Sequence, residues 1–134
     1  MEKYLVGIVG GGPVGLELAI ALKQSGIPYV QFEKNQIAQM IYNFPPQTHF
    51  FSSSERIGIG GIPIQTRDQQ KCSREDYLAY IRSVVMHFRL HVNTYEAVTN
   101  IKRLEGQGFQ LSTHSNKGKA LYEVRFLVLA TGGT

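Results

Sequence analysis

Three predominantly apolar runs along the chain indicate β-strands. The last of them is continuous, which is typical of a strand that is covered on both faces and therefore shows no polar alternation. Several such strands predict a parallel sheet, which requires helices to cross over between them. The runs lie at residues 5–9, 29–32 and 126–130.

Helical spacing appears in two places between these runs. The first predicted helix extends from about residue 13 to residue 25 and ends at Gly26 and Pro28. It is apolar on most sides, as expected beside a parallel sheet. The second begins after Ser73, which suits the N-cap position. Its apolar residues recur at intervals of three and four: Tyr77, Ile81, Val84, Val85 and Phe88.

After the second helix the pattern returns to β-structure. Residues 90–93 predict another short parallel strand. Three β-rich pieces follow, and glycine-containing turns separate them, so we expect a three-stranded antiparallel meander before the last apolar run. The pieces lie at residues 97–104, 109–114 and 120–124.

Composition and charge fit one globular domain. The chain has 134 residues, of which 43% are hydrophobic and 18% charged. Its net charge of +4 comes from scattered basic residues, so neither nucleic acid nor a membrane surface is indicated as a partner. The single cysteine, Cys72, excludes an internal disulfide, and no signal-peptide pattern precedes the first strand. The cytoplasm is therefore the expected location.

The turn between the first strand and the first helix carries the candidate chemistry. Gly10, Gly12 and Gly15 form a G-x-G-x-x-G pattern. The first glycine permits a tight turn, the second lets a pyrophosphate approach the helix N-terminus, and the third allows the helix to pack closely on the strand. This context favours a dinucleotide site over a merely structural glycine turn. The predicted fold class is thus α/β, a Rossmann-like domain with a parallel sheet, helices and a β-meander.

An acidic residue at the end of the second strand supports this interpretation. Glu33 lies where a carboxylate can accept hydrogen bonds from both hydroxyls of an adenosine ribose. Because a carboxylate repels a 2′-phosphate, NAD or FAD is favoured over NADP at this site. Lys34 weakens that exclusion; it is either a solvated loop charge or a contact at the adenosine end.

Other candidates remain open. The segment from residue 34 to residue 71 has no periodicity and is long for a plain connection, so it either covers a cofactor or is a surface excursion with its own small core. His87 and His91 are four residues apart, but we interpret them as helix-end residues rather than metal ligands. Cys72 is interpreted as a packing residue rather than a redox group. No metal site is predicted.

Taken together, the motifs resemble a flavoprotein family. Residues 10–15, 32–34 and 129–133 resemble the FAD-binding part of thioredoxin-reductase-like pyridine nucleotide–disulfide oxidoreductases and their flavin monooxygenase relatives. Residues 41–45, residues 50–55 and the helix from Tyr77 look like the bacillithiol disulfide reductase group. The resemblance covers essentially the whole chain. It suggests that residues 1–134 are one FAD-binding domain, the N-terminal fragment of a longer protein with two dinucleotide domains.

This resemblance implies a flavoenzyme in which NAD(P)H reduces FAD and the flavin reduces a small or low-molecular-weight disulfide. NAD(P)H would bind a domain that this chain lacks, and the protein could assemble as a homo-oligomer. No catalytic side chain is identified. The implied cofactor contacts are Gly10, Gly12, Pro13, Val14 and Gly15 at the pyrophosphate, Glu33 and Lys34 at the adenosine, Val98 at the adenine, Ala130, Thr131 and Gly132 at the pyrophosphate and ribityl chain, and Tyr42 and His49 near the flavin ring.

The chain departs from the family pattern in two respects. Val14 stands where the bacillithiol reductase group has a cysteine, and valine cannot form a mixed disulfide. A Cys-x-x-Cys pair is also absent from the sequence. The alternatives are a flavin-dependent monooxygenase, an NAD-dependent dehydrogenase and a non-catalytic dinucleotide-binding or redox-sensing module. The isolated chain is expected to bind FAD poorly and to be inactive.

Overall fold

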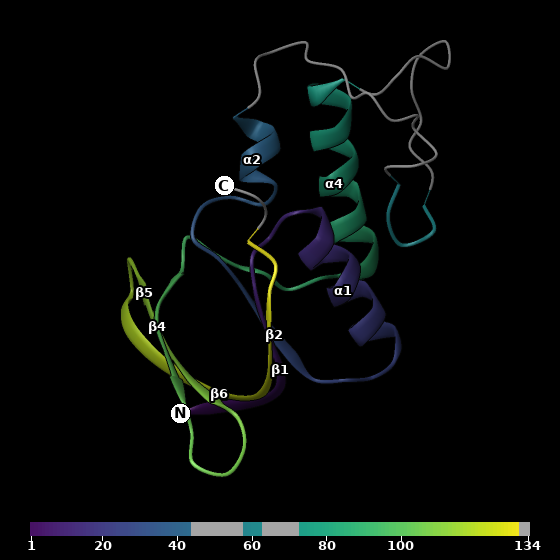
Figure 1. Cartoon of the computed structure of the whole chain (residues 1–134). Coiled ribbons are helices and arrows are strands. Elements are labelled where there is room, and N and C mark those ends of the chain that lie inside the picture. Colours follow the sequence, from purple (N-terminus) through teal and green to yellow (C-terminus); the bar gives the residue numbers. More distant parts are fainter. Residues whose placement is uncertain (44–57, 63–72, 132–134) are drawn as a thin grey trace.

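One curled, six-stranded sheet organises the chain (Figure 1), and its strand order is β3-β2-β1-β6-β5-β4. The computed structural model describes residues 1–43, 58–62 and 73–131. The strands are β1 (Glu2–Val9), β2 (Tyr29–Glu33), β3 (Asn93–Thr94), β4 (Ala97–Arg103), β5 (Phe109–Ser115) and β6 (Gly118–Leu129). The helices are α1 (Pro13–Gln24), α2 (Gln39–Tyr42) and α4 (Arg74–Phe88). The predicted α/β fold class is confirmed.

The parallel half of the sheet contains β3, β2, β1 and β6. The helix α1 connects β1 to β2, as the sequence predicts, and ends with Ser25 as its C-cap. The additional strand predicted at residues 90–93 is displaced, because β3 pairs only Asn93 and Thr94 with the end of β2. The physical reason is the end of α4. Arg89 adopts a left-handed conformation (φ 53°), and the N–H of Leu90 donates to the carbonyl of Val85 in a Schellman motif.

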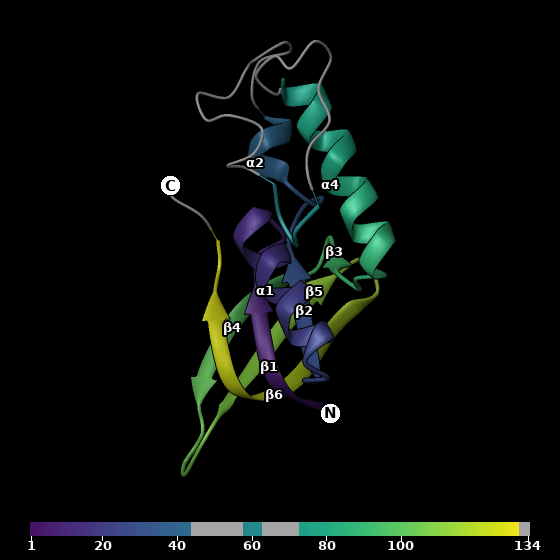
Figure 2. The ribbon, with the colours of Figure 1, turned by 90° about the vertical axis from the view of Figure 1, so that its right-hand side faces the viewer.

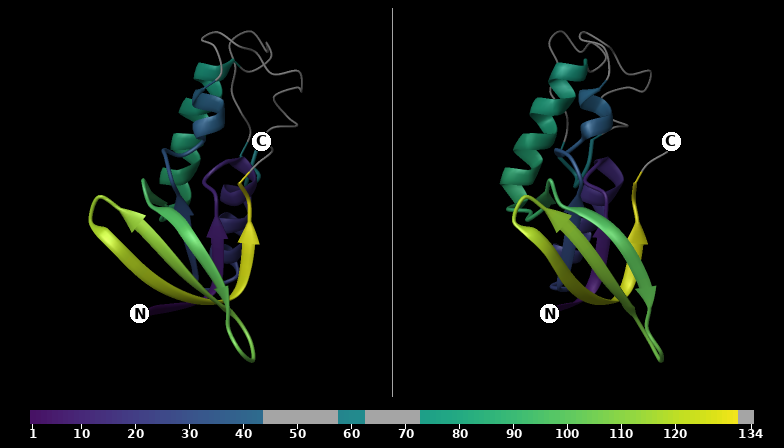
Figure 3. Two further views of the ribbon diagram at one scale, coloured as in Figure 1. Left: turned by 60° about the vertical axis from the view of Figure 1, so that its left-hand side comes forward. Right: turned by 90° about the vertical axis from the view of Figure 1, so that its left-hand side faces the viewer.

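The strand β6 replaces two predicted elements with one. The pieces expected at residues 120–124 and 126–130 are continuous, because nothing at Arg125 breaks the chain. The first part of β6 pairs with β5 in antiparallel fashion, from Gly118 to Val124. Most of β6 also pairs in parallel with β1, from Tyr122 opposite Glu2 to Leu129 opposite Val9. Figure 3 shows the long strand curving from the meander into the parallel sheet. The three-stranded meander β4-β5-β6 itself is confirmed.

Two apolar cores lie on opposite faces of the parallel strands. The first joins β1 to α1 and α4, the helices that cover one side of the sheet in Figure 2. The second lies under the curled meander, which bends far enough for β4 to contact β2. Helices, parallel strands and meander therefore form three layers. The buried members of the second core are Val30, Phe32, Leu111, Tyr122 and Val124.

Two expectations of burial are wrong. Phe126 and Leu129 are 53% and 63% exposed, although their run predicts a strand covered on both faces. The ladder of β5 stops at Val124, so in the described part of the chain no strand pairs with the second edge of β6 beyond that point. Similarly, α1 is buried along one face only: Gly15, Leu16, Ala19 and Ile20.

A short turn of residues 58–62 packs against the two long helices. The hydroxyl of Tyr80, from α4, accepts a hydrogen bond from the N–H of Ile59 at 2.8 Å. The carboxylate of Glu17, from α1, accepts from the N–H of Gly60. The start of α4 is fixed by a capping box between Ser73 and Asp76, as the N-cap prediction requires. Most of the segment predicted to cover a cofactor lies outside the described residues. No helix among the described residues is long and apolar enough to cross a membrane.

The contact between Gly7 and the meander predicts a destabilising substitution. A Cβ atom at Gly7 would lie 2.9 Å from Cγ1 of Val124, which is buried. We expect Gly7→Ala to lower the free energy of unfolding by about 1–3 kcal/mol, measured by denaturant titration. In a Val124→Ala background the same substitution should cost less, because the clashing methyl groups are gone. An equal cost in both backgrounds would contradict this contact.

The second core also predicts a pH dependence. Burial, together with the nearby carboxylate of Glu96, raises the pKa of Tyr122 to about 12 from an ordinary value near 10. The unfolded chain therefore loses this proton first, and stability falls between pH 10 and pH 12, by at most about 1.4 kcal/mol per pH unit from this group. The difference between wild type and Tyr122→Phe in unfolding free energy, measured across this window, isolates the effect. Tyr95→Phe, which removes a phenol that is 62% exposed, serves as the control.

Candidate functional site

The ends of three strands meet at the N-terminus of α1. The N–H of Gly10 donates to the carbonyl of Phe32 at 2.7 Å, which joins the ends of β1 and β2. The N–H of Ala130 donates to the carbonyl of Val9 at 2.8 Å, which joins β6 to the same point. The carboxyl ends of parallel strands are the usual place for ligands in such sheets. The glycine turn, Glu33 and the residues after β6, which are far apart in sequence, are thus brought together.

The turn itself depends on two glycines that lack space for a side chain. Gly10 has φ +125°, and a Cβ there would lie 2.1 Å from the carbonyl oxygen of Ala130. A Cβ at Gly15 would lie 2.5 Å from the carbonyl oxygen of Gly10. The tight turn expected of Gly10 and the close helix packing expected of Gly15 are both confirmed as backbone features.

Gly12, in contrast, faces open space. It is the N-cap of α1, with φ −85° and ψ −173°, and a Cβ there would have no neighbour within 4 Å. Pro13 follows as the first helical residue, and Val14 is 73% exposed beside it. The cap has no side-chain hydrogen bond, and the first turn has no acidic residue. Neither the Gly12 cap nor the first turn of α1 therefore supplies a side chain that neutralises the positive end of the helix dipole, and this end suits an anion.

Glu33 contacts the glycine turn directly. Its Oε1 accepts a hydrogen bond from the N–H of Gly11 at 2.9 Å, and its Oε2 accepts from the N–H of Asn35 at 2.8 Å. Each carboxylate oxygen has a second lone pair, so the group can still accept from a ligand hydroxyl. Lys34, beside it, is exposed. The bond to Gly11 is a structural role that the sequence-based interpretation missed.

The remaining predicted residues are spread more widely. Ala130 and Thr131 follow β6 and lie beside the glycine turn, whereas Val98 is in β4 and packs against the second core. Tyr42 ends α2, where the guanidinium of Arg74 lies 5.0 Å from its ring centroid and donates to its carbonyl. His49, Gly132 and Cys72 lie outside the described residues.

Of the two histidines predicted to be helix-end residues, His87 lies in the last turn of α4, whereas His91 lies beyond the end of that helix. The ring of His87 makes an edge contact with Phe88 at a centroid distance of 4.9 Å. Within residues 1–43, 58–62 and 73–131, no three His, Cys, Asp or Glu side chains form a group that could hold a metal ion.

Two residues that shape the site were not anticipated. The N–H of Ala38, a residue with φ 58°, donates to the carbonyl of Gly11 at 3.0 Å. No sequence signal marks it, because alanine rarely adopts this conformation. The side-chain Nε2 of Gln31 donates to the carbonyl of Gly10 at 2.8 Å. A polar residue in the middle of an apolar strand was the available signal for Gln31.

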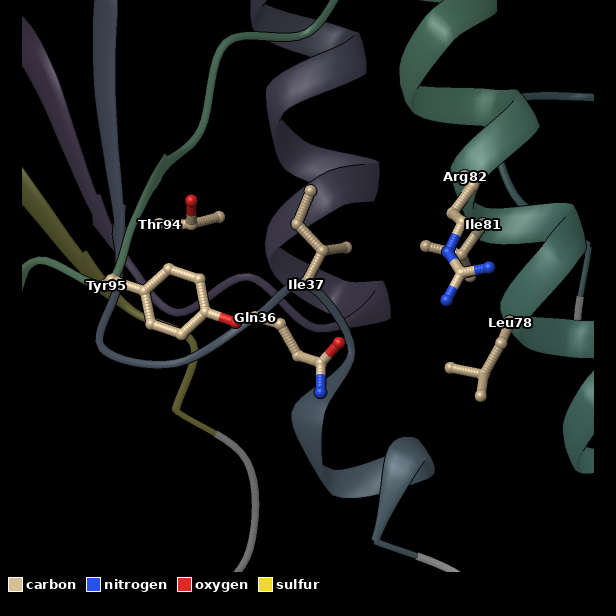
Figure 4. A pocket seen from close by; sticks show the side chains of 7 residues that line it. All are labelled: Gln36, Ile37, Leu78, Ile81, Arg82, Thr94 and Tyr95. Carbon is tan, nitrogen blue, oxygen red and sulfur yellow. The ribbon is translucent and has the colours of Figure 1, made fainter. Parts of the chain in front are cut away.

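A separate pocket of about 230 Å³ lies between α4 and the segments that follow β2 and β3 (Figure 4). Arg82 and Leu78 approach it from α4, and Gln36 and Tyr95 approach it from the opposite side. The N–H of Tyr95 donates to the carbonyl of Asn35, which fixes that wall. None of the glycine-turn residues lines this pocket, so it is distinct from the candidate site.

Comparison with known proteins agrees with this geometry. The pyridine nucleotide-disulphide oxidoreductase family matches residues 7–133. Bacilliredoxin reductase Bdr of Bacillus subtilis is 38% identical over 125 residues, covering 93% of this chain and 37% of that protein. The structure of bacillithiol disulfide reductase Bdr from Staphylococcus aureus matches with a TM-score of 0.89 at 40% identity, over 98% of this chain and 39% of that one.

A more distant match shows the fold alone. A flavin-containing monooxygenase from Stenotrophomonas maltophilia has a TM-score of 0.87 at 23% identity, over 98% of this chain and 39% of that one. The present chain thus spans about two fifths of the length of these relatives. Because the family match covers nearly every residue, including the glycine turn, Glu33 and the end of β6, the chain belongs to the pyridine nucleotide-disulphide oxidoreductase family.

Proposed function

We propose that residues 1–134 are the FAD-binding domain of an NAD(P)H-dependent flavin oxidoreductase that reduces a low-molecular-weight disulfide or a related acceptor. The observation that carries this proposal is the open N-terminus of α1 at Gly12, with the Glu33 carboxylate and the end of β6 beside it. The similarity to a bacilliredoxin reductase of Bacillus subtilis and to a bacillithiol disulfide reductase of Staphylococcus aureus supports the choice of acceptor.

The described residues fit such a cofactor. The backbone from Gly10 to Gly15 would hold the pyrophosphate, because the helix dipole and the N-terminal N–H groups favour a negative charge there. Glu33 would accept from the adenosine ribose, and Ala130 and Thr131 would flank the pyrophosphate and ribityl chain. Lys34 and Val98 remain proposed contacts at the adenosine, and Tyr42 near the flavin. When bound, FAD supplies the hydride and electron chemistry.

The protein's part is binding and orientation rather than covalent chemistry. Val14 is exposed at the mouth of the site, and its side chain offers no thiol to a disulfide substrate. We place NAD(P)H on a part of the protein outside these residues, and a cytoplasmic location and a homo-oligomeric state remain predictions. A flavin-dependent monooxygenase is the second candidate, because Val14 removes the thiol that disulfide chemistry would use.

Cofactor choice is tested by titrating the purified chain with FAD and with NAD. Weak but saturable FAD binding, followed by quenching of flavin fluorescence and competed by ADP, is expected of the isolated chain. Binding of NAD but not FAD would instead favour a dehydrogenase-type site. Binding of neither would contradict the proposal and favour a non-catalytic module.

The glycines of the turn predict two different outcomes of the same chemical change. Gly12→Ala should cost at most about 1 kcal/mol of unfolding free energy, because a Cβ there meets nothing and only the preference for glycine over alanine at an N-cap is lost, yet it should weaken FAD binding by obstructing the phosphate. Gly15→Ala should cost about 1–3 kcal/mol of stability, because its Cβ would overlap the Gly10 carbonyl. Gln24→Ala, at the exposed far end of α1, is the control. Unchanged FAD affinity in Gly12→Ala would refute the placement of the phosphate.

Glu33 predicts a selective loss of adenosine binding. Glu33→Gln keeps an acceptor for the Gly11 N–H but removes the charge, so FAD and ADP should bind about 1–3 kcal/mol more weakly. Inorganic pyrophosphate, which lacks the ribose, should bind at least as tightly as before, because the substitution removes a negative charge beside the glycine turn. Calorimetry with the three ligands distinguishes the cases, and an equal loss for pyrophosphate would argue against a ribose contact.

A further inference from the structure

Gln31 is a polar side chain buried where packing alone favours an apolar one. It lies in the middle of β2, is 1% exposed, and has the buried residues Val30 and Phe32 on either side. Its Nε2 donates to the carbonyl of Gly10 at 2.8 Å, while its Oε1 is buried with no hydrogen-bond partner. A buried acceptor without a partner is unfavourable, so core packing gives no account of this residue.

Gln31 and Glu33 hold the two ends of a single peptide plane. The carbonyl of Gly10 and the N–H of Gly11 belong to the same peptide unit. Gln31 donates to that carbonyl, and Glu33 accepts from that N–H. Residues two apart on a strand point to the same face, so β2 presents both side chains to the turn together. The orientation of this plane is therefore fixed from both sides.

The fixed plane lies directly before the open end of α1. Three consecutive glycines, from Gly10 to Gly12, would otherwise give this turn great conformational freedom. A ligand that binds a mobile turn must also order it, which lowers its affinity. Because the Gly10–Gly11 peptide is already held in place, a ligand has to order less of the turn when it binds.

We propose that Gln31 is a positioning residue for the dinucleotide: by holding the carbonyl of Gly10 opposite Glu33, it orients the glycine turn for the incoming pyrophosphate. This inference rests on the proposed FAD site and goes beyond it, because Gln31 itself does not contact the ligand. The role is separable from stability, since an apolar replacement removes the unpartnered Oε1, and this gain offsets the loss of the hydrogen bond to the Gly10 carbonyl.

Gln31→Met tests this separation, because methionine has nearly the same length but no hydrogen-bonding amide. In the full 134-residue chain we expect its midpoint of thermal unfolding to stay close to wild type, while FAD and ADP bind about three- to ten-fold more weakly. The backbone amide signal of Gly11 in nitrogen-15 NMR spectra should shift in the unliganded chain. Gln24→Met, the same chemical change at the exposed far end of α1, should leave affinity and the Gly11 signal unchanged.

Gln31→Glu provides a conservative rescue. A protonated carboxyl can donate to the Gly10 carbonyl as the amide does, whereas a carboxylate cannot. Burial raises the pKa of such a carboxyl, and the negative charge of Glu33, on the same face of β2, raises it further. The α1 residue beside this position is Gly15, which has no charge that could lower this pKa. Affinity relative to wild type should therefore be retained at low pH and lost as pH rises through that raised pKa.

The outcomes are distinct. Wild-type affinity in Gln31→Met, or a parallel fall in affinity and unfolding midpoint, would overturn the positioning role. If wild type bound neither FAD nor ADP, the proposed function would fail and the dinucleotide role with it. In that case an unshifted Gly11 signal in Gln31→Met would also refute the restraint of the Gly10–Gly11 peptide by Gln31. A shifted Gly11 signal would show that the restraint exists and that only the ligand assignment was wrong.

Discussion

The close approach of the Gly10 backbone to the end of β6 is the constraint on which the rest of the structure depends. A Cβ atom at this position would overlap the carbonyl of Ala130, so the contact exists only because Gly10 lacks one. Without it, β6 could not leave the sheet beside the turn, and the hydrogen bond from Ala130 to Val9 could not form. Three strand ends can therefore meet at the start of α1 because Gly10 has no side chain.

That convergence also explains why the site is held by backbone contacts and by β2. The turn donates to Phe32, accepts from Gln31 and donates to Glu33, so consecutive residues of one strand supply its partners. A glycine-rich turn has a high entropy in the unfolded chain, and these bonds offset part of the cost of ordering it. The outward side of the turn at Gly12 is left free of such contacts, which separates the groups that hold the fold from those available to a ligand.

The sequence predicted the structure best where a feature depends on residues that are close together along the chain. The glycine pattern correctly predicts the turn at Gly10 and the helix packing at Gly15, because both depend on a missing Cβ. The cap of α4 at Ser73 is also local and is confirmed. The contact between Glu33 and Gly11 was missed, since it depends on how β2 is placed beside β1. The exposure of Phe126 depends on which neighbours are present, and the apolar pattern carries no information about that. Likewise, the apolar pattern assigns Leu90 to a strand, whereas its N–H closes the Schellman motif at the end of α4.

The continuity of β6 has a mechanical consequence. A hinge or a flexible joint between the meander and the parallel strands would let one open while the other stays intact. Here the same twelve-residue strand serves both, and its far end lies beside the glycine turn. A distortion of the meander therefore affects the position of Ala130, because both belong to one continuous stretch of chain. The three layers should melt as a single cooperative unit, with no detachable subdomain among the described residues.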